Sequence, residues 1–133
     1  ETWYAKPDAG ALIVSPADED PTEPHDVWPD EMVLAEGLAR WQAVARPAVT
    51  SPIATWAGLR TFAPDRALVI GPDPAEPTFF WLAGQGGYGI QTAPAMGEAC
   101  AALLLHQPWP RHLKEAGLTA EMLSPARLAQ RPG

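Results

Sequence analysis

The sequence predicts an α+β fold of mostly antiparallel strands, with one long amphipathic helix and a second helix that follows a glycine-rich turn. Short apolar and β-branched runs bounded by turn residues indicate the strands, and apolar residues at helical spacing after Pro29 indicate the first helix. Apolar residues make up 47% of the 133 residues, which is enough for one core. We therefore expect one folded segment over residues 1–133, with residues 1–62 and 63–133 as its two parts.

The N-terminal residues predict a hairpin followed by the long helix. Residues 2–16 contain two short apolar stretches around the turn residues Asp8, Ala9 and Gly10. A helix is expected to begin after Pro29 and to end at Pro47. Its apolar face consists of Leu34, Leu38, Trp41 and Ala45, which recur at intervals of four, three and four residues.

Three further strands are expected in the second half of the chain. Residues 48–64 are rich in β-branched and aromatic side chains and predict a long strand, with an edge or a bulge at Pro52. Residues 66–73 predict a short strand. Residues 78–84 are apolar throughout, so this strand is expected to be buried.

The C-terminal third predicts helices. A helix is expected over residues 92–107, with Thr92 as its N-cap and Pro94 in its first turn. A shorter helix begins after Pro110 and stops at Gly117. Small residues four positions apart would let the longer helix lie close to a neighbouring element; they are Ala93, Gly97 and Ala101.

Charge disfavours nucleic acid as a ligand, because the net charge is −7 and no basic stripe is present. The acidic loop lacks the spacing and the central glycine of a calcium-binding EF-hand, so we interpret it as a solvated surface loop. The three histidines also lack metal-ligand spacing. No metal site is therefore expected. The acidic residues of the loop are Asp18, Glu19, Asp20, Glu23, Asp26, Asp30 and Glu31.

Cysteine content and hydropathy point to the cytoplasm. Cys100 is the single cysteine, so no disulfide can form within the chain. No apolar run reaches the roughly 18 residues that span a membrane, and no signal peptide is seen. We expect a cytoplasmic protein and leave open a peripheral position at the inner membrane. Because the chain starts at Glu1 and not at Met, we also expect a fragment of a longer protein.

Gly84, Gly86 and Gly89 spell G-x-G-x-x-G, the fingerprint of a dinucleotide-binding fold. That fold also needs a strand after the helix and an acidic residue about 20 positions further on, and neither follows here. A complete nucleotide-binding fold is therefore not predicted. Two readings remain: a tight connection from strand to helix, or a turn whose backbone N–H groups and helix N-terminus face an electron-rich ligand such as the pyrimidine edge of a reduced flavin.

Several motifs in order resemble the C-terminal part of the FAD-dependent D-amino-acid oxidase, glycine oxidase and sarcosine oxidase superfamily. The stretch "TWAGLR" contains W-x-G-x-R, and P-D and I-G follow it in "TFAPDRALVIG". The turn "GQGGYG" then leads into the A-P-x-x-G helix of "TAPAMGEACAAL". Together with "SPADEDPTEPHDV", these motifs are most similar to bacterial D-amino-acid dehydrogenases of the D-arginine dehydrogenase type. The resemblance covers nearly the whole chain.

The resemblance implies roles for individual residues. Arg60, the arginine of W-x-G-x-R, would bind the substrate carboxylate, with Tyr4 and Gly87 beside the substrate; a surface arginine in a structural salt bridge is the alternative for Arg60. Gln85 stands where many relatives have His, which weakens an acid–base role there, and no catalytic side chain is expected. The residues implied to border non-covalent FAD are Gly86, Gly87, Tyr88, Gly89, Ile90 and Gln91.

The implied reaction is hydride transfer from the substrate Cα to flavin N5, followed by hydrolysis of the imino acid to a 2-oxo acid and ammonia. The substrates would be D-amino acids, including basic ones such as D-arginine, and an electron acceptor would complete the cycle. The chain would be the C-terminal portion of a two-domain flavoenzyme that lacks the complete dinucleotide-binding fold. Its partner would be the missing N-terminal FAD-binding half, without which we expect little FAD binding and little turnover.

Two alternatives remain open. Within enzymes, the chain could belong to a glycine- or sarcosine-type amine oxidase. Outside enzymes, it could be a fragment that binds a carboxylate ligand or a protein partner, which would retain D-amino-acid binding without flavin.

Overall fold

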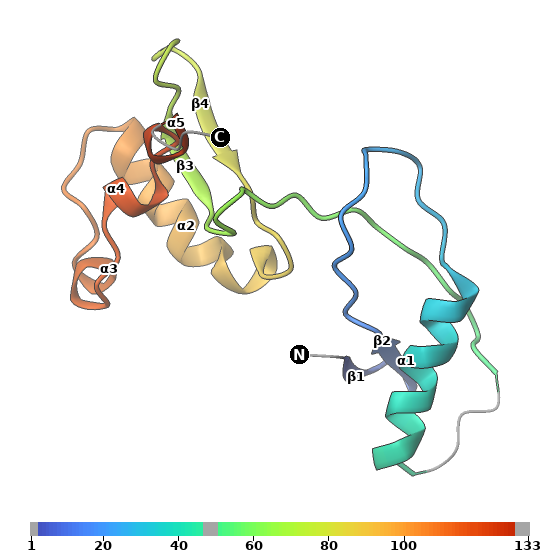
Figure 1. Cartoon of the computed structure of the whole chain (residues 1–133). Helices are drawn as coiled ribbons and strands as arrows, with labels where there is room; N and C mark the ends of the chain where they lie inside the picture. Colours follow the sequence, from blue (N-terminus) through green and yellow to red (C-terminus); the bar gives the residue numbers. More distant parts are fainter. Residues whose placement is uncertain (1–2, 47–50, 130–133) are drawn as a thin grey trace. The chain divides into compact units, whose positions relative to one another are not determined.

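The computed structural model describes residues 3–46 and 51–129, which fall into two compact units. The first unit spans residues 1–59 and the second spans residues 60–133. The described residues form four strands and five helices (Figure 1). This α+β content with short antiparallel sheets confirms the predicted fold class.

The first unit begins with the predicted hairpin. Strands β1 (Tyr4–Asp8) and β2 (Ala11–Ser15) pair antiparallel, with Tyr4 opposite Ser15. Ala9 and Gly10 form the two-residue turn between them, and both have positive φ angles, 48° and 81°. Two successive positive φ angles match the twist of a hairpin, so the local sequence is sufficient to close it.

Helix α1 (Glu31–Val44) confirms the predicted long helix. Asp30 caps its N-terminus, because the carboxylate accepts hydrogen bonds from the N–H groups of Met32 at 2.8 Å and Val33 at 3.0 Å. Gly37 is buried in the helix, where a β-carbon would come within 3.0 Å of Pro16. The expected stop at Pro47 lies outside the described residues. The four residues of the predicted apolar face, Leu34, Leu38, Trp41 and Ala45, are all half-buried.

The second unit is built around another hairpin. Strands β3 (Val69–Pro72) and β4 (Phe80–Ala83) pair antiparallel, with Val69 opposite Ala83. Strand β3 is buried over its first three residues, whereas β4 is not the buried strand that its apolar sequence predicts. In β4, Trp81 is 38% exposed and Leu82 is 50% exposed. Among the described residues this sheet has only two strands, and these two side chains stay partly open to solvent.

Four helices follow β4. They are α2 (Gly89–Leu104), α3 (Arg111–Glu115), α4 (Ala120–Leu123) and α5 (Ala126–Ala129). The core lies between them and β3, where Ile70, Met96 and Leu123 are almost fully buried. Gly117, with a φ of 80°, ends α3 as expected.

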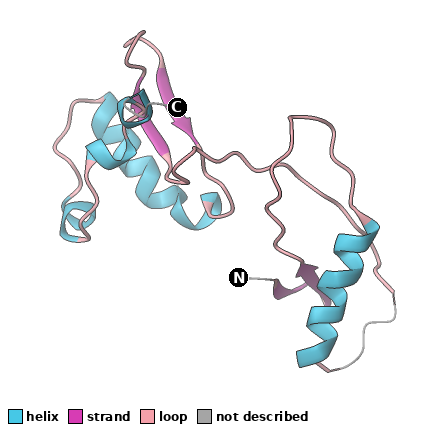
Figure 2. Cartoon of the chain, viewed as in Figure 1, coloured by secondary structure: helices cyan, strands magenta, loops and turns pink. Residues whose placement is uncertain are grey.

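The long strand predicted over 48–64 is wrong for the residues that the structure describes. Residues 51–64 form no strand and are drawn as loop in Figure 2, while residues 48–50 lie outside the described part. Ile53 is 92% exposed and Trp56 is 65% exposed. A strand needs a partner for its ladder of hydrogen bonds, so β-propensity alone does not form one here.

The predicted start of the long C-terminal helix is also wrong. Helix α2 begins at Gly89, and the N–H of Thr92 already donates to the carbonyl of Tyr88 at 3.1 Å. The Thr92 hydroxyl therefore donates back to the carbonyl of Tyr88 at 2.9 Å and does not cap the helix. Pro94 consequently lies inside the helix, beyond its first turn.

Candidate functional site

The glycine turn connects β4 to α2 and is left-handed at two positions. Gly84 has a φ of +73° and Gly86 a φ of +53°, conformations that residues with a β-carbon rarely adopt. The N–H of Gly86 donates to the carbonyl of Thr61 at 3.0 Å. The turn is thus fixed by its own backbone conformation and by a bond to the segment before β3.

That segment, residues 60–67, runs along the turn. A β-carbon placed on Gly87 would lie 2.9 Å from Nη1 of Arg60. A β-carbon on Gly86 would lie 2.5 Å from the Phe62 ring. Glycine is required at 86 by both its positive φ and the Phe62 ring, whereas a side chain at 87 would push aside only the flexible end of Arg60. The structure brings Arg60 and Gly87 together, as the sequence motifs predict for a substrate site, although their binding roles stay predictions.

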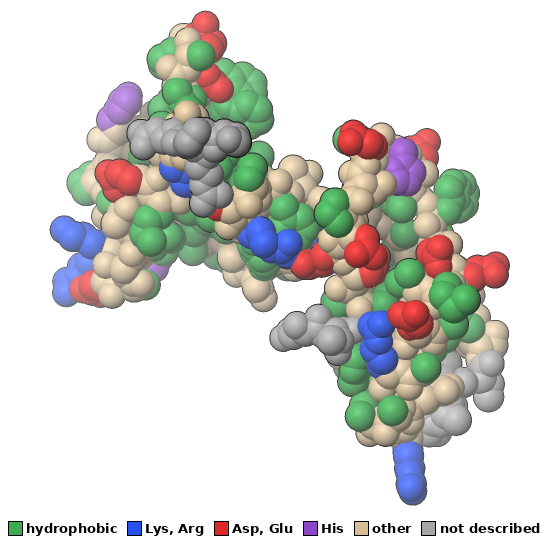
Figure 3. All heavy atoms as spheres, in the orientation of Figure 1, with side chains coloured by type: hydrophobic (Ala, Val, Ile, Leu, Met, Phe, Trp, Pro, Cys, Tyr) green, Lys and Arg blue, Asp and Glu red, His purple; other side chains and the backbone are tan. Residues whose placement is uncertain are grey.

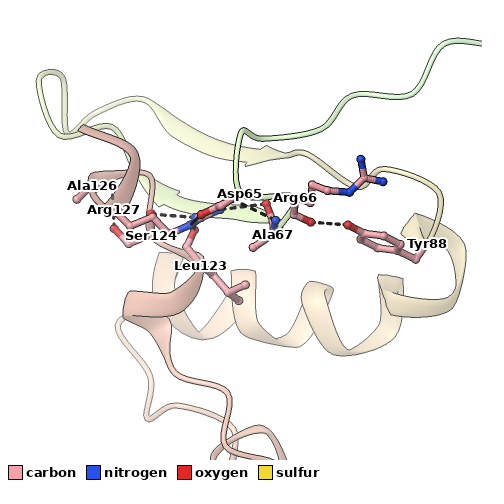
Figure 4. Close-up of polar contacts among 8 residues, drawn as sticks. All are labelled: Asp65, Arg66, Ala67, Tyr88, Leu123, Ser124, Ala126 and Arg127. Atoms are coloured by element: carbon pink, nitrogen blue, oxygen red, sulfur yellow. Dashed lines mark hydrogen bonds and ion pairs between the residues drawn. The ribbon is translucent and has the colours of Figure 1, made fainter. Parts of the chain in front are cut away.

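Tyr88 anchors the turn from its C-terminal side. Its hydroxyl donates to the backbone carbonyl of Arg66 (Figure 4). Its ring meets the Phe62 ring edge to face, with centroids 6.5 Å apart. The Arg66 guanidinium lies 4.4 Å from the centroid of the same Phe62 ring, within the range of a cation–π contact. Phe62 is thus held between Gly86, Tyr88 and Arg66.

The N-terminus of α2 opens directly from this turn. Tyr88 occupies the N-cap position and makes no side-chain capping bond, since tyrosine lacks the short polar side chain that caps a helix. The first three N–H groups of the helix, those of Gly89, Ile90 and Gln91, have no carbonyl within the helix to pair with. Ile90 is 96% exposed, and Gln91 is also exposed. An uncapped terminus of a 16-residue helix can stabilise an electron-rich group.

The other predicted substrate residue belongs to the first unit. Tyr4 lies on β1 and is 49% exposed. Its proposed contact with substrate stays a prediction. Acidic side chains are spread over the surface of the same unit (Figure 3), and those of the acidic loop are exposed.

Neither a metal cluster nor a membrane-spanning helix is found among the described residues. Across residues 3–46 and 51–129, no three His, Cys, Asp or Glu side chains gather as a metal site would require. In the same described part of the chain, no helix has both the length and the apolar character needed to cross a bilayer. At Asp73, the Trp81 indole and the N–H groups of Ala75 and Glu76 hold the pKa of the carboxyl below its ordinary value.

Sequence reasoning missed the residues that support the turn. Thr61 and Phe62 follow W-x-G-x-R directly, so their position beside the motif was the available signal. Asp65 and Arg127 form an ion pair across 62 residues of sequence. No local pattern predicts a pair at that separation.

Comparison with known proteins places these observations in a family. Residues 1–103 match the DAO family model, which is described as FAD-dependent oxidoreductase. A tRNA 5-methylaminomethyl-2-thiouridine biosynthesis bifunctional protein of Paracidovorax citrulli is 35% identical over 96 residues, covering 68% of this chain and 14% of that protein. The Thiobacillus denitrificans protein of the same name is 30% identical over 137 positions, covering 95% of this chain and 21% of that protein. The chain therefore spans about a fifth or less of the length of these relatives.

Proposed function

The chain belongs to the DAO family of FAD-dependent oxidoreductases, and from this we propose that it supplies the carboxylate-binding and flavin-facing part of an enzyme that oxidises amino-acid-like amines. The family's cofactor is FAD. The roles of individual residues are inferred from the geometry of the glycine turn, and the substrate from charge and from the resemblance.

The contact between Arg60 and Gly87 carries the proposal. The guanidinium of Arg60 lies so close to Gly87 that any side chain at position 87 would displace the guanidinium. A planar guanidinium can donate two parallel hydrogen bonds to a carboxylate, which fixes the direction of the substrate's α-carbon. Gly87, without a side chain, leaves the substrate room beside that carbon.

The glycine turn and the start of α2 fit the cofactor. Three of the residues 86–91 are glycines, and they lead into a helix N-terminus that has no side-chain cap. The positive end of the helix would stabilise negative charge on a neighbouring ring. When bound, FAD accepts the hydride from the substrate carbon. Cys100 is half-buried against the core cluster, which supports non-covalent binding of the cofactor.

D-Amino acids are the substrates we favour, with oxidation to 2-oxo acids and ammonia. Basic ones such as D-arginine are included because the net charge of −7 favours approach of a cationic ligand. The resemblance to D-arginine dehydrogenases supports the same choice.

A glycine- or sarcosine-type amine is the second candidate. The relatives from Paracidovorax citrulli and Thiobacillus denitrificans are named for 5-methylaminomethyl-2-thiouridine biosynthesis, and a methylaminomethyl group is an amine of this kind. Arg60 would bind the carboxylate of either substrate class in the same way. A fragment that binds carboxylates or a partner protein without FAD remains the non-enzymatic alternative.

We also propose that α2 packs against the missing FAD-binding part of the protein. One face of the helix is apolar and exposed, with Ile90 at 96% and Leu104 at 53% exposure, and the C-cap residue Leu105 is 64% exposed. A β-carbon on Gly97 would meet no atom within 4 Å. An exposed apolar face of this kind normally marks a surface that packs against another element. The remainder of the flavin-binding domain would cover this face, and an electron acceptor would then meet the assembled enzyme.

The proposal is tested on the full-length protein that carries this segment, loaded with FAD under anaerobic conditions. D-Arginine, D-alanine and sarcosine are added separately, and the loss of visible flavin absorption is followed. Bleaching by D-amino acids supports the first candidate, bleaching by sarcosine alone supports the second, and D-arginine binding without bound flavin supports the non-enzymatic alternative.

The role of Arg60 is tested by Arg60→Ala, with the exposed Arg111→Ala as the matched control. Loss of a charge-assisted carboxylate bond should raise KM by roughly 10- to 100-fold. An unchanged KM in Arg60→Ala would remove this residue from the substrate site.

A further inference from the structure

Arg127 uses every N–H group of its side chain. Nε donates to Oδ2 of Asp65 at 2.8 Å, and Nη2 donates to Oδ1 of Asp65 at 3.1 Å and to the carbonyl of Ala67 at 3.0 Å. Nη1 donates to the carbonyls of Leu123 at 2.8 Å and Ser124 at 3.0 Å. A guanidinium has five N–H donors, so its bonding capacity is filled (Figure 4).

The Arg127–Asp65 pair differs from the other ion pairs of the second unit in its burial. Its side chains are 16% and 18% exposed, whereas those of Arg111 and Glu115 are 91% and 60% exposed. Bidentate geometry and partial burial both strengthen a charge-assisted bond, and a fully exposed pair contributes little. Arg127 therefore ties α5 and the end of α4 firmly to residues 65–67.

Residues 65–67 are also the residues that hold the glycine turn. The Arg66 carbonyl accepts the hydroxyl of Tyr88, while Arg127 binds the residues on both sides of Arg66 (Figure 4). Arg66 has a φ of 62°, a left-handed conformation that costs energy in a residue with a β-carbon and persists only when its surroundings fix it. The carbonyl of Ala67 lies 3.5 Å from the position of a β-carbon on Gly84.

We propose that Arg127 is a positioning residue for the flavin and substrate site. Its hydrogen bonds to Asp65 and Ala67 fix the backbone of residues 65–67. The Arg66 carbonyl between them then holds the Tyr88 hydroxyl, and Tyr88 keeps the glycine turn next to Arg60. This inference rests on the proposed function of the turn. Arg127 lies outside residues 1–103, the part that matches the family model, so the match does not assign it a role.

The first test is amide hydrogen exchange on the 133-residue chain, which requires neither FAD nor substrate. The reporter is the N–H of Gly86, which donates to Thr61, and the internal reference is the N–H of Leu34, which donates to Asp30 in the other unit. Arg127→Gln should raise the exchange rate at Gly86 by roughly 10- to 100-fold, the cost of lost bonds to a charged group. The rate at Leu34 should stay unchanged, and Arg111→Gln should change neither.

A purely structural role for Arg127 predicts a different result. Exchange would then rise at Leu128, whose N–H donates to Pro125 in α5, while Gly86 kept its protection, or it would rise equally at Gly86 and at Leu105, whose N–H donates to Ala101 in the same unit. Either outcome would overturn the proposal. If Arg127→Gln unfolds the second unit, Asp65→Asn is measured in its place. This change weakens the bidentate ion pair, while the hydrogen bonds from Arg127 to the backbone carbonyls are kept. Unchanged exchange at Gly86 in Asp65→Asn would equally overturn it.

The second test uses the FAD-loaded full-length protein. Arg127→Gln should raise KM with little change in kcat, since Arg60 would be misplaced but still present. Arg127→Lys keeps the positive charge but loses the planar guanidinium that binds two oxygens at once. It should give a smaller increase in KM. If exchange rises at Gly86 while Arg60→Ala leaves KM unchanged, the link from Arg127 to the turn stands and the proposed function falls.

Discussion

Arg60 and Gly87 are packed so closely that a β-carbon on the glycine would lie 2.9 Å from the guanidinium nitrogen Nη1. The two residues are 27 positions apart in sequence (87 − 60), and the turn brings them together. The colliding atom is the far end of a flexible side chain, so a larger residue at 87 would move Arg60 and leave the backbone in place.

Gly87→Ala should therefore impair substrate binding more than folding. Gly87 does not have a positive φ, so alanine adds no backbone strain there. Displacement of the guanidinium should raise KM by roughly tenfold, as expected when a charge-assisted bond is weakened. Steady-state kinetics of the FAD-loaded full-length protein measures this. Gly58→Ala is the control, since a β-carbon on Gly58 meets nothing within 4 Å.

Gly86→Ala should instead disrupt the turn. Gly86 has a φ of +53°, and its β-carbon would come within 2.5 Å of the Phe62 ring. The backbone strain alone should cost about 1–3 kcal/mol of unfolding free energy, and the collision with the ring adds to it. Thermal or denaturant unfolding of the 133-residue chain measures the loss.

Gly117→Ala separates the two causes. Gly117 has a φ of +80°, but a β-carbon there would meet no atom within 4 Å. Gly117→Ala therefore introduces backbone strain without a steric clash. A loss of stability in Gly86→Ala no greater than that in Gly117→Ala would show that the Phe62 ring moves aside freely.

The sequence predicted the parts of the fold that depend on neighbouring residues. Ala9 and Gly10 determine the first hairpin, and Asp30 together with the apolar spacing determines α1, because turns and caps are local interactions. The strand expected over 48–64 failed because a strand depends on a distant partner. The start of α2 was missed because glycines at a helix start argue against helix, and here the fixed turn overrides that preference.

For the candidate site, motif order pointed to Arg60 and the glycine turn. The structure brings Arg60 close to Gly87, and the binding roles of both residues stay predictions. The support from Arg127 was not predictable, because its partner Asp65 is 62 residues away and both look like ordinary surface charges in sequence. Phe62 was overlooked because its role, filling the space above a glycine, appears only when the two segments lie together.

Acid stability should depend on Asp73. The Trp81 indole donates to its Oδ2 at 2.8 Å and is the main cause of the lowered pKa of this carboxyl. A lowered pKa in the folded state stabilises the fold at pH values above the ordinary carboxyl range, and this contribution is lost as the pH falls through the lowered pKa. Trp81→Phe should therefore raise the pKa of Asp73 and shift acid unfolding to higher pH.

Carbon-detected NMR titration of the Asp73 carboxyl measures that pKa directly. Trp28→Phe is the matched control, because Trp28 is 83% exposed and belongs to the other unit. An identical Asp73 titration in wild type and Trp81→Phe would mean that the backbone N–H groups of Ala75 and Glu76 dominate instead.

Gly97→Ala should have opposite effects in the isolated chain and in the full-length protein. In the chain, Gly97 lies in the middle of α2, and a β-carbon there meets nothing within 4 Å. Alanine should therefore stabilise the helix by roughly 0.8–1 kcal/mol, the difference in helix propensity. In the full-length protein, the same β-carbon would enter the close contact that we propose between α2 and the FAD-binding part, so stability and FAD retention should fall.

Gly97→Leu enlarges the contrast, since it places a longer side chain on the same exposed face. Unfolding of the chain and of the FAD-loaded full-length protein is compared for wild type and both variants. If Gly97→Ala raises the unfolding free energy of the full-length protein as much as that of the isolated chain, this face of α2 is not covered in the enzyme. The small residues Ala93, Gly97 and Ala101 would then need no close neighbour, and the apolar exposure of α2 would have to serve another partner.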